Sequence, residues 1–241
     1  MGNIQDHKKS DGRRGKLGGL FGVLGPLIIL LGILISALGY SGVQGQSYNL
    51  LNHFVSELGE IGTSDLALAF NMSLILGGIF NTGFMVWLPF QFRGWIRYPL
   101  LLVGTITAIF GALVGIFPMN ALDQHIFVAL TFFNLGLLTA LVYSLVILLT
   151  TKHSLPRWLS IPGIINTLTF FIFTNFPSQF EKEVDFQEGM GGLLANRPDF
   201  IPLALMEWIV ILGVIAWFLI MGIYFLSRHL QTDTHKLGYS E

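Results

Sequence analysis

Two kinds of residue are scarce in this chain of 241 residues: it contains no cysteine, and only 11% of its residues are charged. The absence of cysteine excludes disulfides, palmitoylation, thiol nucleophiles, iron–sulfur clusters and cysteine-ligated zinc. A soluble domain usually has about 25% charged residues, so the polar surface here is too small to cover a water-facing globule. The formal net charge of -1 lacks the basic excess that nucleic-acid binding requires, so we expect no nucleic acid as a partner.

Long apolar runs occupy most of the chain, in which 53% of the residues are hydrophobic. A hydrocarbon core about 30 Å thick is crossed by about 20 apolar helical residues. Six runs reach this length, with Arg97 and Arg157 at the second residue of the third and fifth and no other Lys or Arg: Leu17–Tyr40, Leu66–Phe90, Ile96–Phe117, His125–Thr150, Pro156–Phe176 and Ile201–Ser227. We therefore predict an all-α integral membrane bundle of six transmembrane helices (residues 17–227) between a basic cytoplasmic tail (1–16) and a second cytoplasmic tail (228–241).

The basic residues are distributed unevenly over the connecting segments. Eleven of the thirteen Lys and Arg residues precede the first run, follow the last, or lie between runs two and three or runs four and five, counting Arg97 and Arg157 at the starts of the third and fifth runs. The other two, Lys182 and Arg197, lie in the remaining segments. Because cytoplasmic loops retain Lys and Arg, this bias predicts a multi-pass protein of the plasma membrane with both termini in the cytoplasm.

Small residues recur at four-residue spacing in the first and third runs, for example at Gly18 and Gly22 and at Gly104 and Ala108. Small side chains let helix backbones approach closely. This serves packing within one chain and also suits a homodimer interface, and the sequence leaves both uses open. Membrane lipids are the other expected partners.

The segment Tyr48–Gly62, between the first two runs, has hydrophobic residues at a helical period. Its apolar and polar residues fall on opposite faces, with His53 and Glu57 on the polar one. We predict an amphipathic surface helix that lies along the outer membrane face and exposes its polar side to water. The acidic, glycine-containing segment Phe176–Phe200 would be either a cover over this face or a solvated loop.

Polar residues gather at the predicted outer ends of the helices and form the candidate site: His53, Ser56, Glu57, Asn71, Asp123, His125 and Glu207. Glu207 is the strongest candidate because a carboxylate inside a span is costly, although a position near a helix N-terminus offsets part of that cost. We predict that Glu207 faces the bundle interior beside His53, Asn71 or His125, and that its neighbour Trp208 faces the lipid.

Several of these side chains also have a purely structural explanation. His53 and Glu57 would lie on a solvated face, Asp123 would cap the fourth helix, and His125 would be exposed at the interface. Asn71 begins the glycosylation pattern Asn-Met-Ser, but inside a span an interhelical hydrogen bond is the better interpretation.

Three functions fit these residues. The preferred one is an outer-leaflet polar pocket that binds a lipid or a small amphiphile. A metal-dependent hydrolase acting on a lipid headgroup could use His53, Glu57 and His125 as ligands of a divalent metal such as zinc. A proton-coupled transporter could use Glu207 as its carrier, although no inverted repeats are visible. Haem is not expected, because no His lies well inside a span. Whether the protein is an enzyme stays open.

Four short stretches resemble a known family: Asn52–Gly59, Phe70–Gly78, Gly115–Pro118 followed by His125, and Met206–Ile209. They are similar to motifs of the prokaryotic multi-pass membrane family catalogued as domain of unknown function 998, and the resemblance covers residues 17–227. It implies a helical membrane bundle and a polar site, but no activity. In the family pattern an Arg follows the Glu that corresponds to Glu207. Here Trp208 takes that place, which puts a Glu–Arg pair at this position in doubt.

Overall fold

The computed structural model describes residues 2–42, 45–150, 155–175 and 197–237, and for residues 2–14 and 229–237 the backbone alone. Most of the predicted cover, residues 176–196, lies outside this part. The long helices of the described residues are α1 (Gly2–Leu38), α2 (Ala67–Trp87), α3 (Arg97–Ile116), α4 (Leu122–Leu149), α5 (Ser160–Asn175) and α8 (Pro202–Leu237). The short 3-10 helices are η1 (Val55–Gly59), η2 (Leu88–Gln91), η3 (Met119–Ala121) and η4 (Arg157–Leu159).

The helices confirm an all-α membrane bundle. Lipid offers no hydrogen bonds to the backbone, so apolar runs satisfy their own peptide groups as helices. Five segments of the described chain are long and apolar enough to cross a membrane: Gly15–Leu38, Ala67–Gln91, Arg97–Ile116, Met119–Leu149 and Pro202–Arg228. With 16 residues, α5 is shorter than these, and its crossing stays a prediction. Both predicted tails continue the helices, since α1 begins at Gly2 and α8 ends at Leu237.

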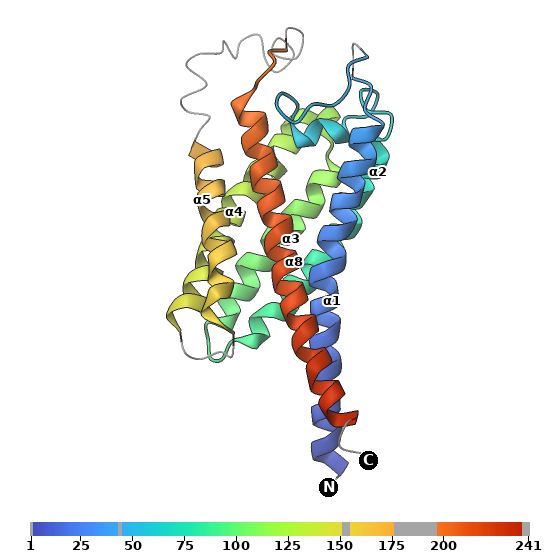
Figure 1. Ribbon diagram of the computed structural model, residues 1–241. Coiled ribbons are helices and arrows are strands. Elements are labelled where there is room, and N and C mark those ends of the chain that lie inside the picture. The colour runs from blue at the N-terminus through green and yellow to red at the C-terminus, as the bar shows by residue number, and fades with distance from the viewer. Residues whose placement is uncertain (1, 43–44, 151–154, 176–196, 238–241) are drawn as a thin grey trace.

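The six long helices form a closed ring (Figure 1). Each packs mainly against its neighbours in the sequence, and α8 completes the ring by packing against both α5 and α1. Both chain termini lie at one end of the ring, where α1 and α8 extend beyond the other helices (Figure 1). We call this the terminal end. The opposite end, which carries residues 39–42, 45–66, 117–121 and 197–201, is the distal end.

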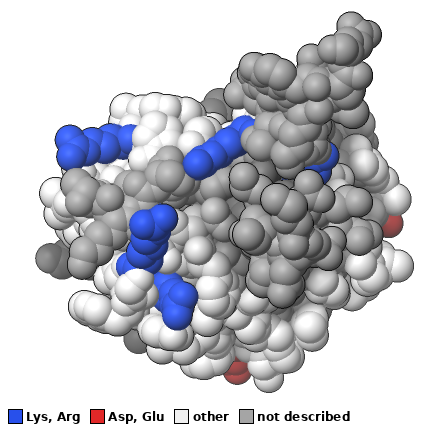
Figure 2. Space-filling model, turned by 90° about the horizontal axis from the view of Figure 1, so that it is seen from below, with Lys and Arg blue, Asp and Glu red and all other residues white. Residues whose placement is uncertain are grey.

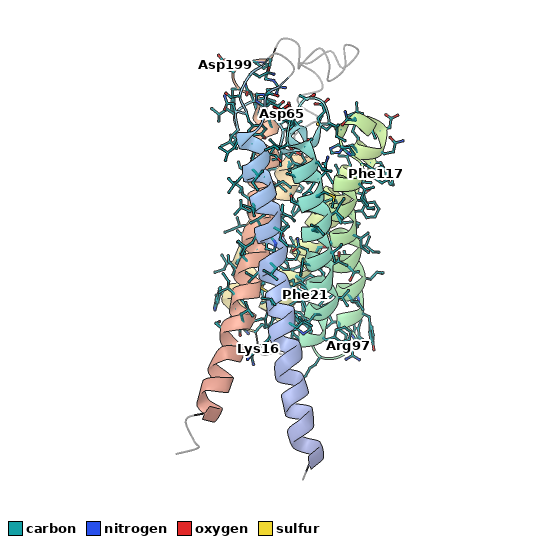
Figure 3. All side chains as sticks on the ribbon, turned by 90° about the vertical axis from the view of Figure 1, so that its right-hand side faces the viewer. Lys16, Phe21, Asp65, Arg97, Phe117 and Asp199 are labelled. Atoms are coloured by element: carbon teal, nitrogen blue, oxygen red, sulfur yellow. The ribbon has the colours of Figure 1, made fainter. Side chains whose placement is uncertain are left out.

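The two ends differ in charge. Figure 2 shows Lys and Arg side chains gathered on the terminal end, with the visible Asp and Glu side chains only at its rim. In Figure 3, Lys16 and Arg97 lie at the terminal end, whereas Asp65 and Asp199 lie at the distal end. The uneven distribution of basic residues along the sequence thus places positive charge at the terminal end of the folded bundle.

Close helix contacts within the chain occupy its small-residue faces. A Cβ atom added to Gly222 of α8 would lie 2.6 Å from a backbone carbon of Gly22 in α1, so these two helices cross almost backbone to backbone. Gly18 packs under the ring of Trp87, and Gly104 faces Tyr143 and a methionine side chain. These glycines serve packing within the bundle, so a homodimer would have to use other faces.

The predicted amphipathic helix over Tyr48–Gly62 is wrong. Turns and the short η1 occupy this segment instead. Its exposure also differs from the prediction: Leu50 and Ile61 are 49% and 61% exposed, whereas His53 and Glu57 are buried together with the apolar Leu58. Glu57 is drawn inward because it bonds to Tyr40 and to Arg197, which lie far from it in the sequence.

Candidate functional site

The distal end is organised around the buried carboxylate of Glu57. The guanidinium of Arg197 donates to both of its oxygens, with Nη1–Oε1 and Nη2–Oε2 distances of 3.1 and 2.7 Å. The Tyr40 hydroxyl donates to Oε2 at 3.2 Å, and the backbone N–H of Phe54 donates to Oε1 at 2.8 Å. Arg197 also donates to the backbone carbonyl of Asn52. The bidentate ion pair therefore joins the loop before α2 to the segment before α8, and the Tyr40 bond joins both to the end of α1.

Two neutral hydrogen bonds connect the same loop to the start of α8. The side-chain amide of Asn52 donates to the carbonyl of Pro198 at 2.9 Å, and the backbone N–H of Ile201 donates to the carbonyl of Leu51 at 2.8 Å. On the other side of the loop, Asn120 exchanges two hydrogen bonds with the backbone of Ile61, at 2.7 and 2.9 Å. The loop is thus tied at several points across the distal end.

His53 lies inside this loop, so the prediction of a solvated position is wrong. The rings of Tyr40 and Tyr48 each lie with their centroids 5.2 Å from its own. Its Nδ1 is 2.8 Å from Oδ1 of Asn52, which favours a proton on Nδ1, and its buried Nε2 has no hydrogen-bond partner among the described residues. Burial, and then the positive charge of Arg197, lower the pKa of His53. The ring is therefore held neutral.

The tyrosines of this cluster are also held in their neutral form. Burial raises the pKa of Tyr40, and the neighbouring negative charge of Glu57 raises it further. Burial likewise raises the pKa of Tyr48, whose hydroxyl lies 2.9 Å from the carbonyl oxygen of Phe54. Both hydroxyls thus remain hydrogen-bond donors to groups of the distal loop.

The prediction that Trp208 faces the lipid is wrong. This side chain is 6% exposed, and its indole N–H donates to the Tyr48 hydroxyl at 2.9 Å. The next residue, Ile209, is 40% exposed and faces outward instead. Since α8 packs against α1, α5 and η1, a wide sector of its circumference is buried, and two consecutive residues fit inside that sector.

Glu207 faces the bundle interior, which confirms its predicted orientation. Its Oε2 accepts a hydrogen bond from the backbone N–H of Val55 at 2.6 Å. The backbone N–H and the hydroxyl of Ser56 lie near the same carboxylate. Val55 and Ser56 belong to η1, which therefore lies against the second turn of α8. The Glu207 carboxylate thus has a backbone hydrogen-bond donor without a cationic partner among the described residues.

Asn71, Asp123 and His125 are placed separately. Asn71 is buried and donates to the carbonyl of Gly59 at 2.9 Å, which joins α2 to η1. His125 is buried rather than exposed at the interface, and its Nδ1 lies 2.7 Å from the carbonyl oxygen of Phe117, a residue that Figure 3 shows at the distal end. Asp123 is exposed in the first turn of α4 and makes no capping bond. Thus no hydrogen bond links Glu207 to its predicted partners among the described side chains.

The predicted metal ligands do not form a set. In the described ranges, no group of three or more His, Asp or Glu side chains is placed to hold a metal ion. Glu57 is engaged by Arg197, and His125 bonds to the backbone at the α3–α4 turn. The described part of the chain therefore supplies no site for the divalent metal that His53, Glu57 and His125 suggest as a sequence pattern.

A cavity of about 120 Å³ lies inside the ring of helices, lined by residues of all six long helices and of η1. Ser56, His125 and Glu207 line its distal end, and Trp217 and Phe218 line it further along α8. Glu207 and Phe218 are about 16 Å apart along the helix at 1.5 Å per residue. The other polar side chains in its wall are Asn81, Thr107, Thr139 and Asn166. The cavity is thus long and mostly apolar, with its one carboxylate at the distal end.

Tyr40 and Arg197 are among the residues of this site that are not predicted from the sequence. Arg197 carries a usable signal, because it is one of only two basic residues on the predicted outer side. A lone cation beside a segment with candidate buried acids indicates an ion pair. Tyr40 carries no comparable signal, since an aromatic residue at the end of a span is normally an interface anchor.

Comparisons with known proteins agree with this architecture. No curated protein and no solved structure matches the chain. The family model described as "Protein of unknown function (DUF998)" matches residues 23–224, from α1 to α8, and so covers every helix that lines the cavity. The chain is therefore a multi-pass membrane protein that belongs to the DUF998 family.

Proposed function

We propose that the protein binds a lipid or a small amphiphile in the central cavity. The observation that carries this proposal is the division of the cavity wall: Ser56, His125 and Glu207 gather at one end, and apolar side chains line most of the rest. Binding sites for small molecules are mostly apolar with a few convergent polar groups. An amphiphile has the same division, so its polar end would lie beside Glu207 and its chain between the helices.

The depth of the cavity supports a membrane ligand. It extends about 16 Å along α8, which is about half of a hydrocarbon core about 30 Å thick. This is the depth of one leaflet. A single chain of leaflet length would therefore fill the cavity while its polar end stays at the level of the distal loops.

The terminal end favours binding over transport. Between the cavity and the terminal end, the helices pack around an aromatic cluster that includes Phe84, Tyr143 and Phe225. A proton-coupled transporter would need a route through this cluster. The hydrolase alternative lacks a metal-ligand set in the described residues. The geometry thus fits a binding protein better than either alternative.

The test is to purify the protein in nanodiscs and to look for bound amphiphile by native mass spectrometry. Ala129 lines the cavity one turn below His125, so Ala129→Phe should fill the cavity and remove the bound species. Leu130→Phe, at an exposed position of the same helix, is the matched control and should keep it. A wild-type protein without adducts, even after amphiphiles are added, would overturn the proposal.

We also propose that the distal end faces outward from the plasma membrane and that both termini are cytoplasmic. The supporting observation is the basic terminal end, since Lys and Arg are retained on the cytoplasmic side (Figure 2). A reporter that is active only in the cytoplasm should be active when fused after Gln231. Activity of an export-dependent reporter at the same position would refute this orientation.

A further inference from the structure

The distal end of the cavity is rich in hydrogen-bond acceptors. An ionised carboxylate has about four acceptor positions. One of those on Glu207 is used by the Val55 N–H, and Ser56 lies near the same carboxylate. The remaining acceptor positions belong to a side chain that lines the cavity. Ser56 lines the cavity too, and its hydroxyl oxygen can accept a hydrogen bond from a ligand.

His125 adds a third acceptor to the same end. Its Nδ1 lies 2.7 Å from the carbonyl oxygen of Phe117, which can only accept, so Nδ1 carries the proton. In the neutral imidazole, Nε2 is then an acceptor. Glu207, Ser56 and His125 all line the cavity, and each has a lone pair that can accept a hydrogen bond from a ligand.

No cation balances this arrangement. None of the described residues that line the cavity is Lys or Arg. Arg197, the guanidinium of the distal end, is paired with Glu57 and is not part of the cavity wall. A phosphate or carboxylate beside Glu207 would meet a like charge in a poorly solvated site, where repulsion is strong. An ammonium or hydroxyl group would instead meet acceptors.

We infer that the amphiphile enters with a hydrogen-bond donor that carries no negative charge, as in a single-chain amine or alcohol, and that the cavity rejects fatty acids and alkyl phosphates. This inference rests on the proposed function and specifies the ligand class of the same site. Glu207 would bind the polar end directly, and His125 and Ser56 would complete its hydrogen bonds. The chain would extend between the helices toward Trp217.

Trp217 provides a fluorescence readout, because it lines the cavity away from the polar end. The probes are ω-bromododecylamine, ω-bromododecanol, ω-bromododecanoic acid and ω-bromododecyl phosphate, whose bromine quenches indole fluorescence at close range. Each is titrated above neutral pH, so that Glu207 is ionised, into the purified full-length protein in nanodiscs. The amine and the alcohol should quench saturably, with half-saturation at least about tenfold lower than that of the acid and the phosphate, a difference of about 1.4 kcal/mol. Trp217→Phe should remove the saturable component.

A second variant separates charge from hydrogen bonding. Glu207→Gln keeps an acceptor oxygen but loses the negative charge, so it should weaken the amine more than the alcohol. Equal half-saturation for all four probes would overturn the inference about the headgroup, although the cavity would remain a binding site. A preference for the acid or the phosphate would overturn that inference in the same way. An absence of saturable quenching by every probe would overturn the proposed function as well. The wild-type probe series decides the inference even if a variant fails to fold.

Discussion

The two ends of the bundle are stabilised by different interactions. At the terminal end, aromatic rings pack edge to face, as Trp87 does against Phe225 with centroids 4.7 Å apart. At the distal end, a buried ion pair between Glu57 and Arg197 holds loops that are far apart in the sequence. Lipid chains are as apolar as a protein core, so burial of apolar surface alone stabilises neither end. The terminal end depends on close packing, and the distal end on satisfied polar groups.

The largest effect should follow from breaking the ion pair. Arg197→Ala leaves the Glu57 carboxylate buried without its cation, and loss of one partner of a buried pair costs about 3–5 kcal/mol. Thermal unfolding of the purified protein in detergent measures this loss. The double variant Arg197→Ala, Glu57→Gln removes the stranded charge and should recover most of the stability. A double variant no more stable than Arg197→Ala would show that the pair does not hold the distal end.

A packing change at the terminal end should cost somewhat less. Phe84 is fully buried in the aromatic cluster. Phe-to-Ala changes in soluble cores cost about 3–5 kcal/mol, but the part that reflects transfer from water is weaker in lipid, so we expect about 2–3 kcal/mol for Phe84→Ala. Ile79→Ala, at an exposed position of the same helix, is the matched control and should be nearly neutral in the same unfolding assay. Equal losses of stability for the two variants would contradict the view that packing around Phe84 stabilises the terminal end.

A single hydrogen bond at the distal end should have a smaller effect. Tyr40→Phe removes the hydroxyl that donates to Glu57 at 3.2 Å, and because this bond to a charged group is long, we expect a loss of about 1.5 kcal/mol, the low end for such bonds. The measurement is a double-mutant cycle with Glu57→Gln. Additive effects of the two substitutions would mean that the hydroxyl and the carboxylate do not interact.

The smallest effect should be a pH dependence confined to the distal end. The pKa of His53 is lowered from 6.5 in the folded protein, so the unfolded chain binds the proton more readily. Stability contributed by neutral His53 is therefore present above pH 6.5 and is lost as the pH falls below that value. Melting temperatures over a pH series that brackets this value should show the loss in the wild type and a weaker one in His53→Gln. Phe84→Ala should keep the wild-type pH profile, and a changed profile would break the distinction between the two ends.

The outer polar residues show what a local sequence pattern can predict about burial and what it cannot. Periodicity in the segment between α1 and α2 predicts a solvated polar face, yet His53 and Glu57 are buried. His53 bonds to its neighbours Asn49 and Asn52, but the cation that pairs with Glu57 is remote, since Arg197 lies 140 residues beyond it. No local pattern encodes a contact across that separation, because it depends on how the loops meet once the ring has closed. Glu207 is different, since the cost of a carboxylate within a span already predicts its inward orientation.

The sequence by itself determined the membrane class, the family resemblance and the approximate bounds of the apolar helical segments, although α1 and α8 continue beyond them to Gly2 and Leu237. These follow from local composition, because an apolar run in lipid must satisfy its own backbone as a helix. Only the tertiary structure decided that Trp208 is buried, that Arg197 neutralises Glu57, and that Glu207 bonds to η1 and borders a cavity. Such features depend on which surfaces meet when six helices close into a ring, and side-chain spacing along one helix carries no information about the surface opposite.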